Sequence, residues 1–125
     1  MIETYIVLTL LFTHWIADFL FQTDEMAINK SKHNGWLFVH VLTYTSIFLA
    51  PLLATRGFTG VGNMYFLGIT FLCHFITDYF TSRLSSKLWK EDKRHWFFVV
   101  IGFDQFSHYL QLLLTYEFVF KHFHQ

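Results

Sequence analysis

The sequence contains little charge, one cysteine and one proline. Asp, Glu, Lys and Arg make up 14% of its 125 residues, whereas an ordinary soluble domain carries about 25%. The formal net charge is zero, so the chain has no overall basic field that would attract nucleic acid. The single cysteine, Cys73, excludes a disulfide within the chain. The first apolar run has no basic flank and no small-residue cleavage site, so we expect a retained helix rather than a removed signal peptide.

Hydrophobic side chains are abundant instead, at 54% of the sequence, and aromatic ones reach 22%. They gather in four segments of about 19 to 25 residues, each long enough to cross a hydrocarbon layer of ~30 Å. The segments are residues 4–22, 36–54, 61–80 and 96–120. The predicted fold class is therefore all-α, a four-transmembrane-helix bundle forming one domain over residues 1–125. The alternative is a soluble all-helical protein with unusually apolar helices, which a mean hydropathy of only +0.37 leaves open.

Basic residues concentrate on one side of this predicted bundle. Residues 23–35 and 81–95 together hold seven of the nine basic residues, namely Lys30, Lys32, Arg83, Lys87, Lys90, Lys93 and Arg94. The other side has only Arg56 and Lys121. Because short loops rich in Lys and Arg stay in the cytoplasm, we predict that residues 23–35 and 81–95 are cytoplasmic and that both termini lie outside.

Ionisable residues inside the apolar segments indicate a functional site. Each costs ~2.5–3.5 kcal/mol on insertion scales, so it needs a partner or a purpose. Three pairs are spaced four residues apart, which places both side chains on one helix face. The pairs are His14/Asp18, His74/Asp78 and Asp104/His108, and His40 stands alone in the second segment. Although the segments alternate in direction, all seven residues fall roughly 7 to 18 Å from the cytoplasmic ends. This shared depth predicts that they meet.

Imidazole and carboxylate ligands together suit zinc, manganese or iron, and no set of thiolates is present. We predict a site for one or two divalent ions, with zinc preferred and manganese or iron as alternatives. The predicted metal ligands are His14, Asp18, His40, His74, Asp78, Asp104 and His108. Asp18, Asp78 and Asp104 are also the candidates for a catalytic general base. The alternative is a set of His–Asp pairs that only hold helices together.

Three further polar residues are candidates for substrate binding: Gln22, Lys30 and Gln105. For the two glutamines, hydrogen bonds between helices are an equal alternative. For Lys30 and its basic neighbours, contact with anionic lipid headgroups is the favoured alternative.

The motifs also resemble a known family. The matching stretches are residues 14–24 (HWIADFLFQTD), Asn29-Lys30, His40, residues 74–79 (HFITDY) and residues 104–108 (DQFSH). In this order they resemble a family of small bacterial and phage integral membrane proteins of unknown function. The resemblance implies a multi-helix fold in the bacterial inner membrane. The placement of His and Asp is also similar to that in membrane-bound metal-dependent hydrolases described as LexA-binding inner-membrane proteins.

Three functions of different kinds follow from these observations. The first is a metal-dependent membrane hydrolase with a phosphoester or a lipid-linked phosphate as substrate. The second is an ion or proton pathway, which the scarcity of ionisable residues in the outer half of the segments opposes. The third is a non-catalytic phage or host-defence membrane module with a structural metal. The expected partners are membrane lipids and a second copy of the chain in a homo-oligomer, with no nucleic acid.

Overall fold

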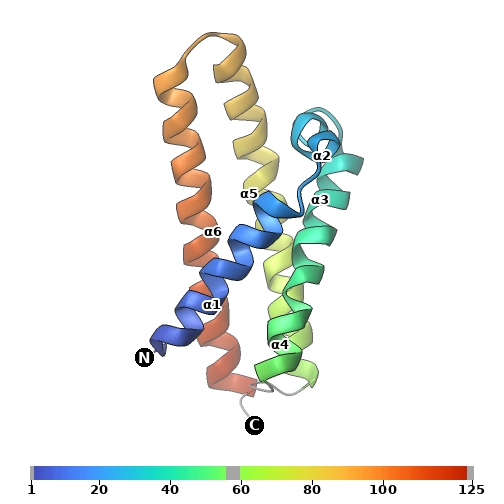
Figure 1. Ribbon diagram of the computed structural model, residues 1–125, viewed down its shortest axis with the longest axis vertical. Helices are drawn as coiled ribbons and strands as arrows, with labels where there is room; N and C mark the ends of the chain where they lie inside the picture. Colours follow the sequence, from blue (N-terminus) through green and yellow to red (C-terminus); the bar gives the residue numbers. More distant parts are fainter. Residues whose placement is uncertain (1, 56–59, 124–125) are drawn as a thin grey trace.

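The computed structural model describes residues 2–55 and 60–123, and every regular element within them is helical (Figure 1). In chain order the elements are α1 (Thr4–Trp15), the π-helical turn η1 (Ile16–Leu20), α2 (Asp24–Asn29), α3 (Asn34–Ile47), α4 (Leu49–Thr55), α5 (Gly60–Lys90) and α6 (Arg94–Phe123). The predicted all-helical fold class is confirmed. Arg56, which entered the count of basic residues, lies outside the described residues.

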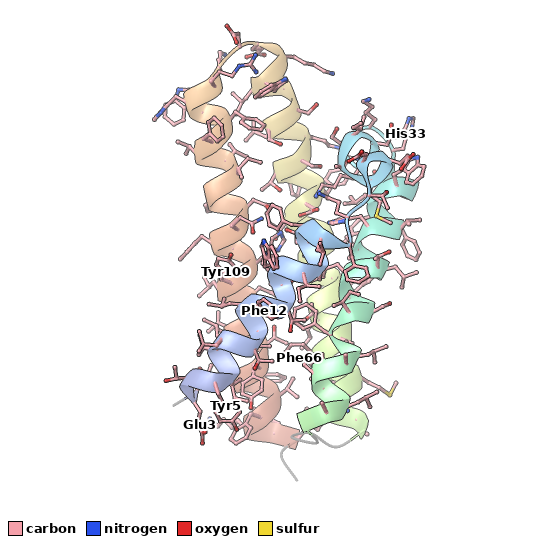
Figure 2. The ribbon with its side chains drawn as sticks, in the orientation of Figure 1. Glu3, Tyr5, Phe12, His33, Phe66 and Tyr109 are labelled. Atoms are coloured by element: carbon pink, nitrogen blue, oxygen red, sulfur yellow. The ribbon has the colours of Figure 1, made fainter. Side chains whose placement is uncertain are left out.

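The helices run lengthwise between two ends of the molecule. The start of α1 and the end of α6 lie at one end, which we call the terminal end (Figure 1). The short α2 and the turn between α5 and α6 lie at the opposite end, which we call the hairpin end. Figure 2 shows Glu3 and Tyr5 near the terminal end and His33 near the hairpin end.

The first apolar segment is shorter than predicted. Residues 4–22 were expected to form one span, but α1 and η1 together end at Leu20. The chain then turns, and the Thr23 side chain caps α2 by accepting a hydrogen bond of 3.3 Å from the Met26 amide. An N-cap threonine satisfies an amide that the helix itself leaves unpaired. The polar sequence after Leu20 therefore starts a new helix instead of lengthening the first.

The second apolar segment is bent at its proline. Helix α3 ends at Ile47, and α4 begins at Leu49. Pro51 has no amide hydrogen to donate to the Ile47 carbonyl, and its ring clashes with that carbonyl in a regular helix. The chain tightens there, with the Phe48 amide bonded to the Thr45 carbonyl at 3.2 Å. The predicted segment 36–54 therefore consists of two helices that together span Asn34–Ala54.

The third segment extends well beyond its predicted end. We expected a helix over 61–80 and a polar loop over 81–95, but α5 continues to Lys90 and α6 begins at Arg94. Residues 81–90 contain no Gly or Pro, and Leu84 and Leu88 continue the helical spacing. At ~1.5 Å per residue α5 is about 46 Å long, so it exceeds a hydrocarbon layer of ~30 Å by roughly 16 Å.

A tight turn joins α5 to α6. The Lys93 amide donates to the Leu88 carbonyl at 3.0 Å, and the Asp92 amide donates to the Trp89 carbonyl at 3.1 Å. Asp92 has a φ of 57°, the left-handed conformation that closes a helix C-terminus in this pattern. The turn returns the chain antiparallel, and α5 and α6 form the most extensive helix contact in the described chain.

Three stretches in the described residues are long and apolar enough to cross a membrane: Asn34–Ala54, α5 and α6. The fourth apolar stretch, Thr4–Leu20, belongs to a shorter class of helix. At ~1.5 Å per residue it covers about 25 Å, and Figure 1 shows α1 lying obliquely across α5 and α6. The fold therefore contains three helices of membrane-spanning length and one shorter apolar helix, not four equivalent spans.

Large apolar side chains are exposed on the surface, whereas ionisable side chains are buried in the interior, the reverse of the usual arrangement in a soluble protein. Large apolar side chains are exposed on all the long helices, including Leu8 (62%), Phe80 (66%) and Phe103 (62%). A soluble monomer rarely exposes so much apolar surface, whereas a lipid-facing surface requires it. The buried apolar cluster runs from the middle of the bundle, where Tyr44 contacts His14 and His74, toward the terminal end, where Figure 2 labels Phe66. It consists of Ile6, Leu10, Ala17, Tyr44, Phe48, Leu52, Phe66, Leu112 and Val119. Buried ionisable residues occupy the middle of the bundle.

Candidate metal centre

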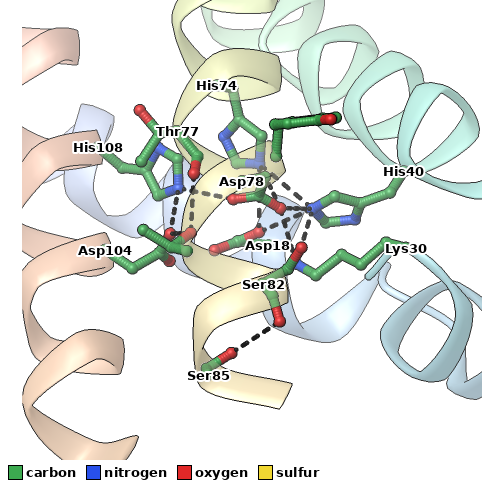
Figure 3. A network of polar contacts seen from close by, with 12 residues as sticks. Asp18, Lys30, His40, His74, Thr77, Asp78, Ser82, Ser85, Asp104 and His108 are labelled. Atoms are coloured by element: carbon green, nitrogen blue, oxygen red, sulfur yellow. Dashed lines mark hydrogen bonds and ion pairs between the residues drawn. The ribbon is translucent and has the colours of Figure 1, made fainter. Parts of the chain in front are cut away.

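Four histidines and three aspartates converge in the middle of the bundle. Figure 3 labels His40, His74, His108 and the three aspartates. None of the seven residues is more than 8% exposed. They are the residues that the shared depth predicted to meet: His14, Asp18, His40, His74, Asp78, Asp104 and His108. The structure therefore brings all the predicted ligands into one cluster, although it does not by itself assign a role to each.

The local structure of each helix directs these side chains inward. On α5 the four-residue spacing places His74 one helical turn from Asp78, and on α6 it places Asp104 one turn from His108. Both pairs lie on the faces that the two helices share. Asp18 instead lies in η1, where the Phe21 amide bonds to the Ile16 carbonyl five residues back. Such π-helical turns are rare in proteins overall. Those that occur often lie at functional sites, where the extra residue redirects a side chain.

A first group of donor atoms surrounds His40 Nε2. This atom lies 3.1 Å from Asp18 Oδ1 and 3.2 Å from Asp78 Oδ2. It also lies 3.2 Å from His74 Nε2. His74 Nε2 in turn is 3.6 Å from each of the same two carboxylate oxygens. Four donor atoms, from Asp18, His40, His74 and Asp78, thus lie within 4.8 Å of one another.

A second group shares Asp18 with the first. It consists of Asp18, Asp104 and His108. His108 Nε2 lies 3.4 Å from Asp104 Oδ1 and 3.0 Å from Asp78 Oδ1. Asp78 therefore directs one oxygen toward the first group and the other toward His108. Carboxylates shared in this way are typical of paired-metal sites.

Hydrogen bonds alone do not account for the first group. A neutral imidazole nitrogen either donates one hydrogen bond or accepts one, yet His40 Nε2 faces two carboxylate oxygens and a second Nε2 within 3.2 Å. Four ligands at ~2.0–2.1 Å from a zinc ion would be separated by about 3.3–3.4 Å along the edges of a tetrahedron. The five distances given above, between 3.1 and 3.6 Å, match such edges. The spacing of these atoms is thus one that could hold a metal ion.

His14 is placed differently from the other histidines. Its Nδ1 shares a hydrogen bond of 2.8 Å with the Tyr44 hydroxyl, and its Nε2 lies 2.8 Å from Gln105 Oε1. The Gln105 amide nitrogen donates to Asp18 at 3.2 Å and to Asp104 at 3.1 Å. Because Gln105 Oε1 accepts a hydrogen bond, His14 Nε2 must carry the proton. His14 lies in neither donor group, and it acts on the carboxylates through Gln105.

Lys30 reaches the same cluster from the C-terminus of α2. Its Nζ lies 2.7 Å from Asp78 Oδ2 and 3.4 Å from His40 Nε2, and its side chain is only 16% exposed. Burial disfavours the ammonium charge, but the Asp78 and Asp18 carboxylates outweigh burial and raise the pKa of Lys30 above its usual value. Lys30 therefore holds a positive charge beside the donor atoms of the first group.

Two residues of the cluster were missed from the sequence. Tyr44 is fully buried, and its ring centroid lies 3.8 Å from that of His74. Thr81 donates a hydrogen bond to Asp104 Oδ1. Tyr44 follows His40 by four residues and Thr81 follows Asp78 by three, so extending the helical spacing beyond the ionisable residues was the signal that would have found both.

A cavity of about 610 Å³ leads from the cluster toward the hairpin end. Asp18, Asp78 and Asp104 line its inner part. All three predicted substrate-binding residues, Gln22, Lys30 and Gln105, line it too. Gln22 Oε1 is buried without a hydrogen-bond partner, which leaves it free to bind a ligand in the cavity. The cluster is thus open to small molecules from one end.

Comparisons with known proteins place the chain in a family without a known activity. No curated protein and no solved structure matches the chain. The model of one family, described as "Protein of unknown function (DUF3307)", matches residues 6–125. The resemblance to a family of unknown function is thereby confirmed, and nothing in the matches bears on the likeness to metal-dependent hydrolases. The cluster and its cavity lie within the matched residues, and the chain belongs to the DUF3307 family.

Proposed function

We propose that this protein is a metal-dependent hydrolase embedded in the bacterial inner membrane, with a site that opens toward the cytoplasm. The observation that carries the proposal is the arrangement around His40 Nε2. Two carboxylate oxygens and a second imidazole nitrogen lie within 3.2 Å of this atom, more than the single hydrogen bond of a neutral imidazole nitrogen accounts for. In this proposal four helical spans cross or enter the bilayer, including the short Thr4–Leu20. The basic hairpin end faces the cytoplasm, in keeping with the positive-inside rule.

The two donor groups divide the metal-binding roles. Asp18, His40, His74 and Asp78 would hold the first ion, for which zinc is the preferred candidate because the ligands are four imidazole and carboxylate groups. Asp104 and His108, with Asp18 shared, hold a second. His14 acts as a positioning residue through Gln105 and is not itself a ligand.

Charge counting indicates how many ions bind at rest. With neutral histidines, the Asp18, Asp78 and Asp104 carboxylates and the Lys30 ammonium give a cluster charge of about −2. One divalent ion neutralises this charge. A second ion adds two uncompensated positive charges in a buried place, which is costly unless an anion accompanies it. A phosphate-bearing substrate supplies that anion, so the second ion binds together with substrate.

The chemistry follows from the carboxylates and the cavity. A divalent ion held by these residues would supply Lewis acidity: it would lower the pKa of a water molecule toward ~7 and offset charge on a phosphoryl oxygen. Asp104 lines the cavity and offers one carboxylate oxygen to the second donor group, so its other oxygen is left to take the proton from the attacking water. Gln22 and Lys30 face the same space and would orient the substrate.

A second candidate function is a membrane module in which these residues only hold the helices together. The observation that favours it is that Nδ1 of His40, His74 and His108 has no hydrogen-bond partner, whereas a metal-bound histidine usually donates from its other nitrogen. The proton-pathway alternative has less support. Within residues 2–55 and 60–123, the buried side chains toward the terminal end are apolar residues and uncharged polar ones such as Thr70 and Thr115.

Elemental analysis of the purified protein separates these functions. We expect one equivalent of divalent metal, rising toward two with a bound phosphate, and His74→Ala should lose most of it because His74 belongs to the first donor group. The exposed His95, replaced in His95→Ala, is the matched control and should retain the wild-type content. Asp104→Ala should stay folded but lose phosphoester hydrolysis. A wild-type protein that remains metal-free after incubation with zinc, manganese and iron contradicts the proposal.

Replacing Lys30 should strengthen metal binding. The Lys30 ammonium lies 2.7 Å from Asp78 Oδ2, a donor atom of the first group. Two like charges ~4 Å apart repel by up to about 4 kcal/mol at an effective dielectric constant of 20. We therefore expect Lys30→Met to lower the metal Kd by about tenfold or more, measured by competition with a chelating dye. Lys32→Met, on the same segment, is the control; equal or weaker binding in Lys30→Met would show that Lys30 does not face the ion.

A further inference from the structure

We propose that the substrate is a membrane amphiphile, the phosphate ester of a long-chain apolar alcohol, whose headgroup reaches the carboxylates while its chain extends toward the lipid. This inference rests on the proposed hydrolase function and narrows its substrate class. It follows from how polar, basic and apolar side chains are distributed around the cavity.

The cavity is much larger than a phosphate group. A phosphate has five non-hydrogen atoms, and giving each the ~30 Å³ share of a liquid water molecule yields at most about 150 Å³. The cavity holds about 610 Å³, within the usual range for organic ligands. Roughly three quarters of the space therefore remains for the part of the substrate that is attached to the phosphate.

The part of the cavity lining that comes from η1 and α6 includes apolar side chains that continue onto the outer surface: Phe19, Phe97 and Ile101. Ala27, Ile28 and Trp89 add apolar lining from α2 and α5. Phe19 is 49% exposed and Ile101 is 36% exposed, so these side chains line the cavity and face outward at once. On α6, Phe98 and Phe103 lie close by in the sequence and are more exposed still. An alkyl chain can thus leave the cavity along apolar surface without crossing water, which favours a lipid over a soluble ester.

The part of the lining that comes from α5 and the residues at the end of α2 is basic and rich in hydroxyl groups, and we call it the basic side. Its members are Lys30, Ser31, Lys32, Thr81, Ser82, Ser85, Ser86 and Lys90. A second pocket, of about 330 Å³, shares Ser31, Lys32, Ser86 and Lys90 with the cavity and adds Arg83, Lys87 and Glu91. Ammonium, guanidinium and hydroxyl groups are the usual partners of phosphate oxygens. The basic side therefore receives an anionic headgroup at the level where a bilayer presents one.

The reaction can be written with its atoms balanced. The oxygen of water forms a bond to phosphorus, and the ester bond between phosphorus and the alcohol oxygen breaks. One proton of the water passes to Asp104 and from there to the departing alcohol oxygen. The products are inorganic phosphate, which leaves past the basic side, and an apolar alcohol, which leaves along the apolar lining.

Phosphate release from dodecyl phosphate and butyl phosphate tests the inference, using the metal-loaded full chain in detergent micelles. Each methylene moved from water to an apolar surface contributes up to ~0.8 kcal/mol, so a chain that is only partly enclosed should still give a large preference. We expect kcat/KM for dodecyl phosphate to exceed that for butyl phosphate by about 100-fold or more. Equal values for the two esters overturn the lipid inference and leave the hydrolase function standing.

Variants separate recognition of the chain from partition of the substrate into micelles. Ile101→Ser removes part of the apolar lining and should reduce the preference for dodecyl phosphate at least about fivefold. Leu114→Ser, nearer the terminal end of the same helix and 57% exposed, is the control and should leave the preference unchanged. If both variants behave alike, the preference reflects the micelle and the inference is wrong.

A variant of Lys90, which lines the cavity, tests the proposed contact with the phosphate headgroup. Lys90→Gln should lower kcat/KM for both esters by roughly tenfold, the size of one charge-assisted hydrogen bond, and weaken the dependence of the rate on salt. Lys121→Gln, at the terminal end, is the charge-matched control. Failure of the metal-loaded protein to hydrolyse either ester overturns the hydrolase proposal and the inference together.

Discussion

Asp78→Asn is expected to abolish metal binding and hydrolysis while leaving a helical protein. Asp78 Oδ2 faces His40, His74 and Lys30, and Oδ1 faces His108. An amide removes the negative charge and one of the two oxygens, so the first donor group loses a carboxylate ligand and His108 of the second group loses its carboxylate neighbour. We expect metal affinity to fall at least about 100-fold, equivalent to ~2.7 kcal/mol, and metal content to approach zero after dialysis against a metal concentration that saturates the wild type.

Two companion variants show whether this loss is specific. Asp92→Asn makes the same change in the exposed turn between α5 and α6, where asparagine also tolerates the left-handed conformation; it should bind metal normally. Asp78→Asn also leaves Lys30 partly buried without its carboxylate, which destabilises the fold. The double variant Asp78→Asn/Lys30→Met should recover that stability yet still bind no metal. Wild-type metal content in Asp78→Asn would remove Asp78 from the ligands.

Metal removal is the second large effect we expect. A ligand at a thousand times its Kd stabilises the folded state by about 4 kcal/mol, and for a chain of this length each kcal/mol shifts Tm by roughly 3 °C. Saturating zinc should therefore raise the Tm of the purified protein by on the order of 10 °C over the same protein with a chelator, measured by differential scanning fluorimetry in micelles.

The response of Asp78→Asn to the same treatment is the control. Its Tm should be the same with zinc and with chelator, because the first donor group has lost its Asp78 carboxylate. The hydrogen-bonded module described above makes the opposite prediction, since its histidines and aspartates would hold the helices equally well without metal. Equal Tm values for the wild type in zinc and in chelator would support that module and contradict the metal centre.

The meeting of the seven ionisable residues could be predicted from the sequence because it depends on two regular quantities. The four-residue spacing fixes which helix face carries His74 and Asp78, and the rise of ~1.5 Å per residue fixes how deep that face lies. Residues at equal depth on neighbouring helices lie at the same level of the bundle, even where the helices alternate in direction. Helix face and depth both follow from residue positions in the sequence, so the prediction required no knowledge of tertiary contacts.

Several features could not be predicted in this way. The predicted end of α5 at residue 80 was wrong because residues 81–90 are polar enough to suggest a loop. The helix nevertheless continues through them to Lys90. The π-helical turn at Asp18 leaves no mark in hydropathy, so the first segment was drawn as one regular helix. The contacts of Gln105 with His14 and Asp18 depend on how α1 lies against α6, which spacing within either helix does not specify.

The apolar packing toward the terminal end makes the proposed reaction one-sided. Within the described residues, Ile6, Phe48 and Phe66 belong to the buried apolar cluster, whereas the cavity lined by the aspartates extends toward the hairpin end. Under the proposal, the protein would consume phosphorylated lipid in a single leaflet and leave the same lipid in the opposing leaflet untouched. Its long-term rate of hydrolysis would then depend on how fast that lipid crosses the bilayer, because each molecule from the far leaflet must move to the near leaflet before it can be cleaved.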